Sequence, residues 1–549
     1  MPEHLRALIV ILVLATVVFT FAKAPACALA STTQDFERRR NLWFAITCAA
    51  FLAHNFWIFI VATMVLLLFA LPREPNKLAL FYFLLFAVPM FSADIPGLGI
   101  INYLFAIDYV RLLALVILLP VFLYLRKQPD TERFGRLFAD KILVGYLILQ
   151  FVLMLNRDDA SRMQLEDGNF MLRFLLLISS SVFTETLRHG AFYAFIDVFL
   201  PYYVASRSIR KLAQFRDVLT SFVMAALVLA ALGAFEYAKQ WLLYKQLEVA
   251  LDAPRWGLGN YLGRESGLRA LASVGQPICL GYVMVVATGF FLFLRKSITN
   301  TMAWSIGLIA LLIGLIAPLS RGPWMGAAAL LLVFVAAGPA PGKSLLKLGL
   351  VGTIVISVLL VSPASQVIIN HLPFVGTIET ENVTYRQRLF AIGTQVILQN
   401  PFFGSFDFLK APAMQELIQG QGIIDIVNSY LGVALASGLV GLSLFAGFFM
   451  VVAAGIYSGM RTLRDGLSES YLLGQALLAT LLGILIVIGT TSSITIIPVI
   501  YWSVAGLGVA YSRMLALEKS AAKAPHAAVL RATQPARIRR ASPIGGGRK

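Results

Sequence analysis

The sequence has few charged residues and few side chains that bind metals. Only 13% of its 549 residues are charged, whereas soluble globular proteins contain roughly a quarter. This shortage excludes an ordinary soluble domain. The three cysteines, Cys27, Cys48 and Cys279, lie in or beside apolar segments and lack metal-ligand spacing. We expect them to pack as small side chains and predict no metal site.

Common catalytic and nucleotide-binding patterns are also missing. The chain contains no glycine-rich nucleotide-binding loop, no zinc motif and no Ser/His/Asp set. It has five histidines, of which His371 alone lies in a long loop between apolar runs. We therefore expect neither a cofactor nor a nucleotide-driven pump.

Long apolar runs are abundant, and 59% of the residues are hydrophobic. Runs of about 20 apolar residues can cross a bilayer, and continuous runs favour helices over barrel strands. The sequence predicts an all-α, polytopic transmembrane helix bundle of about 14 spans (12–14), with a large, partly helical periplasmic loop. The expected spans are 5–24, 43–71, 78–95, 102–125, 138–155, 171–203, 217–240, 274–294, 301–318, 322–338, 345–363, 428–457, 472–490 and 494–514.

The net charge of +17 comes from basic residues in short loops between apolar runs. This pattern indicates the positive-inside rule and not a nucleic-acid partner. It predicts that both termini lie in the cytoplasm, together with five basic loops. These loops are 125–136, 206–211, 295–297, 342–347 and 461–464. The sequence "ERRR" at 37–40 violates the rule, because alternation of the expected spans places it outside.

Two long segments fall on the outer side, 241–273 and 364–427. Loops of this length within a compact protein are usually functional. The expected divisions are N-terminal transmembrane helices (1–215), transmembrane helices with outer-face arginines (216–363), the large periplasmic loop (364–427), C-terminal transmembrane helices (428–516) and a basic, disordered cytoplasmic tail (517–549).

Five arginines gather at the expected outer face, against the positive-inside bias. They are Arg264, Arg269, Arg321, Arg386 and Arg388. A single arginine there can simply snorkel to lipid headgroups, but guanidinium groups also bind phosphate bidentately. The cluster predicts a site for a pyrophosphate-linked substrate. The candidate bases in the same long loop are His371, Glu379, Glu381 and Asp425, with Glu416 as a further acid.

The stretch "IVNSYLGVALASGLVGL" (426–442) opens the apolar run that follows the large loop. Asn428 and Ser429 stand at its start. Ala434, Gly438 and Gly441 have the spacing of closely packed helices. Upstream, "NPFFGSFD" (400–407) predicts a turn that ends a helix over 386–399.

Four stretches, taken in order, resemble the O-antigen ligase-related family. They are "LRALASVGQPICLG" (268–281), "LSRGPWMG" (319–326), "YRQRLFAIGTQVILQNPFFGS" (385–405) and "VNSYLGVALASGLVGL" (427–442). The resemblance covers roughly 215–510. The family includes O-antigen ligases and polymerases of lipid-linked polysaccharide repeats.

The resemblance implies a metal-independent glycosyltransferase of the bacterial inner membrane, multi-pass, that takes a glycan from undecaprenyl pyrophosphate on the periplasmic side. It implies catalytic roles for Arg321, Arg386 and Arg388. It implies substrate-binding roles for four other residues: Arg264, Arg269, Asn428 and Ser429. The implied partners are an undecaprenyl-pyrophosphate-linked oligosaccharide, membrane lipid, and a chain-length regulator or flippase.

In ligases of the family a loop histidine is thought to activate the acceptor, and Val427 occupies that position here. Valine can neither accept a proton nor donate a hydrogen bond. This favours an O-antigen or exopolysaccharide polymerase. Three alternatives remain open: a ligase that transfers glycan to lipid A-core with its base elsewhere, a transporter of lipid-linked glycans, and an inactive relative.

Overall fold

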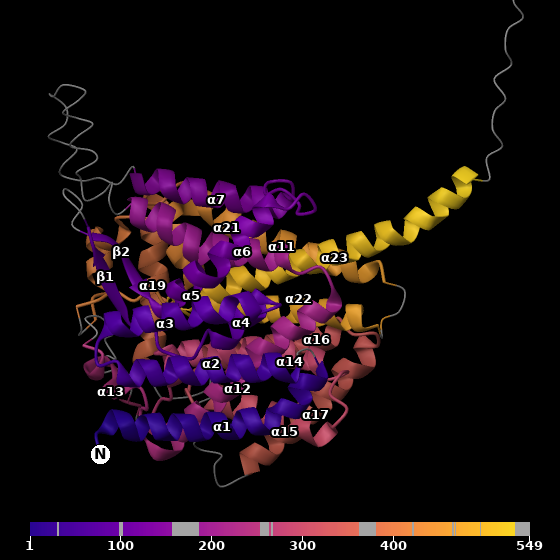
Figure 1. The fold of residues 1–549 in the computed structure, drawn as a ribbon. Helices are drawn as coiled ribbons and strands as arrows, with labels where there is room; N and C mark the ends of the chain where they lie inside the picture. The colour runs from indigo at the N-terminus through magenta and orange to yellow at the C-terminus, as the bar shows by residue number, and fades with distance from the viewer. Residues whose placement is uncertain are drawn as a thin grey trace, which may run out of the picture.

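The computed structural model describes residues 1–29, 32–97, 103–155, 186–252, 263–264, 267–361, 380–419, 422–463, 466, 468–494 and 496–532. The molecule is 77% helical with almost no sheet. Long helices lie side by side along one direction (Figure 1). Nine helices in the described part of the chain are long and apolar enough to cross a membrane, and two shorter apolar ones accompany them. The chain is a multi-pass, helical membrane protein, as predicted.

The N-terminal half contains, in order, α1 (Glu3–Leu29), α2 (Thr33–Leu52), α3 (Phe56–Ala70), α4 (Lys77–Leu84), β1 (Ser92–Pro96), β2 (Tyr103–Asp108), α5 (Tyr109–Leu113), α6 (Leu119–Lys127), α7 (Phe138–Leu155), the π-helical segment η3 (Thr186–Phe199), α11 (Leu200–Ser208), α12 (Leu212–Lys239) and α13 (Lys245–Ala250).

The C-terminal half contains β3 (Gly263–Arg264), β4 (Gly267–Leu268), α14 (Pro277–Leu294), α15 (Thr301–Ile316), α16 (Arg321–Ala336), α17 (Pro341–Val361), α19 (Thr380–Gln399), α20 (Pro412–Gln415), α21 (Ser429–Arg461), α22 (Glu469–Ile488) and α23 (Ile497–Ala532). The predicted stop of the loop helix at Asn400-Pro401 is confirmed by the end of α19.

The expected helices at 78–95 and 102–125 are only partly correct. Helix α4 ends at Leu84, and the chain then forms the antiparallel β1–β2 hairpin before α5 begins. Pro89 and Pro96 lie in this stretch, and each removes a backbone donor and disfavours helix in the residue before it. Hydropathy alone missed the change, because Leu85 to Val88 are as buried as a transmembrane helix.

The expected span 43–71 consists of two separate helices, α2 and α3. Between them His54 has φ +50°, and the Asn55 side chain accepts hydrogen bonds from the backbone N–H groups of Trp57 and Ile58. This cap starts α3, while α2 extends back to Thr33. The chain therefore forms two helices here in place of one, of which only α3, continued to Arg73, is apolar enough to be a candidate membrane span.

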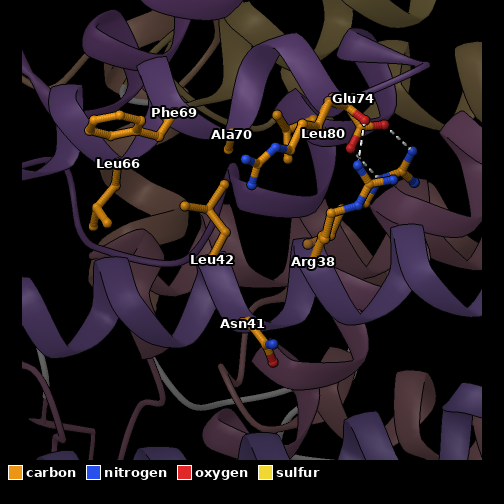
Figure 2. A pocket seen from close by; sticks show the side chains of 10 residues that line it. Arg38, Asn41, Leu42, Leu66, Phe69, Ala70, Glu74 and Leu80 are labelled. Carbon is orange, nitrogen blue, oxygen red and sulfur yellow. Dashed lines mark hydrogen bonds and ion pairs between the residues drawn. The ribbon is translucent and has the colours of Figure 1, made fainter.

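The division into α2 and α3 changes the end of the bundle at which "ERRR" (37–40) lies. Arg39, in the second turn of α2, binds Glu74 (2.5 Å) and Asp217 (2.7 Å), and all three side chains are at least nine-tenths buried. Figure 2 shows the pocket beside this network. Asp217 lies near the start of α12, close to the basic loop 206–211. The "ERRR" segment is therefore at the same end of the bundle as that loop, consistent with the positive-inside rule.

Helix α1 begins at one end of the bundle, and α23 leaves it at the opposite end (Figure 1). Glu3 accepts a hydrogen bond from the Trp241 indole (3.1 Å), which follows the C-terminus of α12. Arg513 of α23 binds the Ser206 carbonyl (2.6 Å) and Glu132 (2.9 Å), in the regions of two basic loops. This arrangement does not support the expectation that both termini lie in the cytoplasm, since a shared side requires both to leave the bundle at the same end.

The two ends of the bundle differ in the elements that they carry, and we call them the loop end and the tail end. The loop end holds α13, α19 and the β1–β2 hairpin, and the tail end is where α23 leaves (Figure 1). Helix α23 continues to Ala532, into the tail expected to be disordered. Strong helix formers such as Ala, Leu, Glu and Lys fill the stretch after Arg513, which favours this extension. Residues 533–549 lie outside the described part.

A second buried ion pair ties the tail end together. Arg207 contacts Asp140 at 2.5 Å, and neither side chain is exposed. Asp140 also accepts hydrogen bonds from the Tyr202 hydroxyl (2.8 Å) and the Gly135 N–H (3.0 Å). These bonds join α7 to α11 and satisfy a carboxylate that would otherwise be costly to bury.

Arg207→Met should destabilise the protein strongly, because it leaves Asp140 buried without its cation. We expect a loss of about 3–5 kcal/mol in unfolding free energy, measured by denaturation in detergent. Arg136→Ala is the matched control, since that side chain is 78% exposed. Equal stability of the two variants would contradict the structural role of the pair.

Candidate functional site

The turn between α15 and α16 brings two of the predicted arginines together. Arg269 donates to the Pro318 carbonyl (3.1 Å) and to the Ser320 hydroxyl (2.7 Å). Ser320 is buried and immediately precedes Arg321, the first residue of α16. Leu319 has φ +49°, so the turn is tight. The predicted proximity of Arg269 and Arg321 follows from this turn, at the loop end of the bundle.

Glu236 holds the segment that carries Arg269. Its carboxylate, buried at the end of α12, accepts hydrogen bonds from the N–H groups of Leu243 (3.0 Å), Leu271 (2.8 Å) and Ala272 (2.7 Å). Ala272 has φ +46°. The sequence analysis missed this residue, because a lone acid in an apolar helix carries no sign of its distant backbone partners.

A second centre is the segment after α22, residues 490–493, which we call the hydroxyl loop. It contains Thr490, Thr491, Ser492 and Ser493. A Cβ added at Gly322 would overlap the Thr490 side chain, so the first turn of α16 lies directly against this loop. The hydroxyl loop therefore adjoins the Arg321 turn.

Three of the predicted residues, Arg386, Ser429 and Asp425, form hydrogen bonds with the hydroxyl loop. Arg386 of α19 donates to the Thr490 carbonyl (3.1 Å). The buried Ser429 hydroxyl donates to the Thr491 carbonyl (2.8 Å). Ser492 donates to the Asp425 carboxylate (2.6 Å). Residues far apart in sequence thus meet at one segment.

Asp425 is also held through its backbone. The Tyr385 hydroxyl donates to the Asp425 carbonyl (2.9 Å). The Asp425 N–H in turn donates to the Tyr385 hydroxyl oxygen (3.1 Å). Burial raises the pKa of the Tyr385 phenol, so that it keeps its proton at neutral pH. Because Tyr385 precedes Arg386 on α19, one helix positions both a guanidinium and the candidate base.

The hydroxyl loop is the main element that sequence reasoning missed. Its signal was present: four consecutive hydroxyl side chains follow an apolar helix, at the end expected to face the periplasm. Hydroxyl runs are common in turns, and nothing in the sequence indicates that this one would contact α19 and α21.

The predicted residues outside this cluster differ in how far the structure places them. Arg388 is exposed on α19 and makes no hydrogen bond or ion pair with any described residue. Arg264 lies in β3 and Glu381 in α19, but only their backbones are described. His371 and Glu379 lie outside the described residues.

Asn428 caps α21. Its side-chain oxygen accepts hydrogen bonds from the N–H groups of Tyr430 (3.0 Å) and Leu431 (3.1 Å). This satisfies donors at the start of the helix. The polar pair therefore has a local structural purpose: Asn428 starts the helix and Ser429 fixes it to the hydroxyl loop.

Gly438 was expected to allow close packing of two helices, but it contacts a loop. Its φ of 64° and ψ of −167° interrupt α21, and a Cβ there would overlap the backbone of Phe402. The loop 400–405 inserts at this break. Leu439 N–H donates to the Pro401 carbonyl (2.8 Å), and Ser405 N–H donates to the Leu435 carbonyl (2.9 Å). Gly441 does lie near a neighbouring helix, with Leu149 of α7 at 3.7 Å from a Cβ built there.

The described part of the large loop on either side of 400–405 forms a small core of its own with the start of α21. Leu389 and Val396 of α19 pack with Met414, Leu417 and the start of α21, and Val427 packs against this cluster. Val427 is therefore part of an apolar contact.

Comparison with protein-family models and with curated proteins found no match.

Proposed function

We propose that this protein is an inverting polysaccharide polymerase, of O-antigen or exopolysaccharide, in the bacterial inner membrane. It joins repeat units carried on undecaprenyl pyrophosphate, and the loop end faces the periplasm. In this orientation the N-terminus is periplasmic and the C-terminal tail cytoplasmic. The basic loops 125–136 and 206–211, at the tail end, support it.

One observation carries the proposal: three of the five predicted outer arginines, Arg269, Arg321 and Arg386, lie around a single polar segment. Arg269 and Arg321 approach it through the α15–α16 turn, while Arg386, Asp425 and Ser429 bind it directly. Guanidinium groups neutralise a pyrophosphate and stabilise the charge it develops as it leaves. The residues present thus match a donor whose leaving group is a pyrophosphate.

The reaction needs a base as well as a cationic site. A hydroxyl of the acceptor sugar attacks the anomeric carbon of the donor, the bond from that carbon to the pyrophosphate oxygen breaks, and undecaprenyl pyrophosphate leaves. The hydroxyl proton passes to a carboxylate. Asp425 is the candidate that the structure places at the hydroxyl loop, so we assign it this role.

Asp425→Asn should lower the polymerisation rate by about 10²–10⁴-fold, the usual contribution of a general base. Ser492→Ala should lower it less, because the carboxylate remains and loses one hydrogen bond. Chain growth on lipid-linked repeat units measures both variants. Glu416→Gln is the control, an acid of the same loop without a contact to the hydroxyl loop. An unchanged rate in Asp425→Asn would assign the base elsewhere.

The environment of Val427 favours a polymerase over a ligase. Its side chain packs against the apolar cluster of the loop, so this position contributes stability here. The ionic groups buried in the helices argue against a transporter, since Arg39, Asp140 and Arg207 lie within two turns of helix ends and are paired. Transporters typically place such groups near mid-membrane.

The deciding experiment supplies purified protein with undecaprenyl-pyrophosphate-linked repeat units, with and without lipid A-core, and resolves products by length. A ladder formed without lipid A-core is the expected result. Glycan transferred only to lipid A-core would establish a ligase. No product with either acceptor, from a substrate that a known polymerase of matching specificity elongates, would overturn the proposal and favour a transporter or an inactive relative.

A further inference from the structure

A second polar cavity lies at the tail end of the bundle, away from the hydroxyl loop. It measures about 650 Å³ and lies among α6, the segment 128–134 and η3–α11. This is within the range of small-ligand sites, roughly 300–1,000 Å³. Two of its lining residues show where it lies: Thr131 accepts a hydrogen bond from Arg210 (3.1 Å), and Glu132 binds Arg513. The cavity therefore opens where the basic loops emerge.

Cations and aromatic rings line this cavity. Arg126, Lys127 and Arg133 are exposed, and Phe122, Phe199 and Tyr203 form an apolar wall. The rings pack edge to face, with Phe122 and Tyr203 centroids 4.9 Å apart. Such a wall accommodates an apolar chain while the cations face an anion. The lining therefore fits an amphipathic ligand with a negatively charged head.

The three cations have no carboxylate partner in the described part of the chain. Glu132 is the one acid that lines the cavity, and it already binds Arg513 (2.9 Å) and Arg136 (3.7 Å). The local charge is thus strongly positive and uncompensated. Concentrating three like charges is unfavourable unless a counterion joins them.

The pocket of Figure 2 is also polar and also lies at the tail end, but most of its cations are paired with acids. It measures about 250 Å³. Its buried cation Arg39 is neutralised by Glu74 and Asp217, and Arg38 is paired with Asp35. Two of the three arginines that line this smaller pocket are thus paired with acids, and the third, Arg73, is exposed. The three cations of the cavity beside α6 have no such acidic partners among the described residues, which leaves them available to an external anion.

We propose that the cavity lined by Arg126, Lys127 and Arg133 binds an anionic phospholipid of the cytoplasmic leaflet. The headgroup phosphate lies among the three cations, and an acyl chain follows the wall of Phe122, Phe199 and Tyr203. Basic cavities between transmembrane helices on the cytoplasmic side are suited to such headgroups. Leu123 and Tyr124 of α6 are exposed beside it, on a surface that faces lipid. This site is independent of the proposed polymerase reaction.

Native mass spectrometry of the full chain in detergent tests the site. Delipidated protein is titrated with phosphatidylglycerol or with phosphatidylcholine of the same acyl chains. We expect a specific phosphatidylglycerol adduct, which the combined change Arg126→Ala, Lys127→Ala and Arg133→Ala weakens roughly a hundredfold. The matched control removes three other exposed cations of expected cytoplasmic loops, by Arg136→Ala, Lys343→Ala and Lys347→Ala. It should bind like the unchanged protein.

Comparisons between the two triple variants and between ligands show whether the binding is specific. Equal losses in the two triple variants would show a general charge effect and overturn a specific site. Displacement of the lipid by glycerol phosphate or inorganic phosphate at equal concentration would show that the acyl chain contributes nothing, which also contradicts it. Binding of phosphatidylcholine as tight as phosphatidylglycerol would exclude a role for the cations. A melting scan of each variant confirms that the fold is retained.

Discussion

Arg321→Ala is expected to abolish polymer formation while the protein accumulates normally in the membrane. Arg321 begins α16 beside Ser320, which binds Arg269, and Gly322 lies against the hydroxyl loop. Loss of one group that stabilises transition-state charge typically costs about 10²–10³ in rate. We expect a decrease of at least about a hundredfold, measured as chain growth on lipid-linked repeat units.

Two further substitutions make this result specific. Arg321→Lys keeps the charge but loses the planar fork, so activity should fall between the unchanged protein and Arg321→Ala. Lys410→Ala removes a cation of the same large loop whose side chain is 74% exposed and paired with Asp407. It should leave the rate unchanged. Normal polymer in Arg321→Ala would refute the assignment of a pyrophosphate site to this turn.

Gly438→Ala should have the second large effect, through the fold of the large loop. The backbone at Gly438 adopts φ 64° and ψ −167°, a region essentially reserved for glycine that costs about 1–3 kcal/mol for other residues. The new methyl group would also overlap Phe402. We expect the loop 400–405 to leave the break in α21 and the unfolding free energy to fall by about 3 kcal/mol.

Limited proteolysis reads out this detachment. Trypsin should cut faster after the exposed Lys410, and polymer synthesis should fall because Asp425 shares the same loop. Gly404→Ala should behave alike, since Gly404 has φ 60° and its added Cβ would lie 2.6 Å from the Gly438 nitrogen. Gly447→Ala on α21 is the control, because no atom lies within 4 Å of its added Cβ. Identical cleavage of the Gly438→Ala and Gly447→Ala proteins would disprove the interlocking of loop and helix.

Much of the architecture could be read from hydropathy. The spans around α7, α12, α14, α15 and α22 were predicted within a few residues. An uninterrupted apolar run can satisfy its backbone hydrogen bonds within lipid only by forming a helix. Errors arose where a cap or a proline divides such a run. Asn55 divides α2 from α3, and the stretch with Pro89 and Pro96 becomes a hairpin. Because the division between α2 and α3 was not predicted, α1 begins at the opposite end of the bundle from the one expected.

The candidate site was predicted in part. Sequence alone singled out Arg269, Arg321, Arg386, Asp425 and Ser429, because unexpected charges and polar residues at one face are visible in the chain. Their meeting point, residues 490–493, was not predicted. Hydrogen bonds such as those from Ser492 to Asp425 and from Arg386 to Thr490 join residues 67 and 104 positions apart.

The sequence by itself determined that this is a helical, multi-pass membrane protein with arginines at one face, because composition and hydropathy act locally along each helix. The tertiary structure alone decided which ends of the helices meet. Glu236 finds its three backbone donors, and Gly438 admits the loop 400–405, only in the folded chain. Contacts of this kind depend on the geometry of packed helices, and no local pattern of residues encodes that geometry.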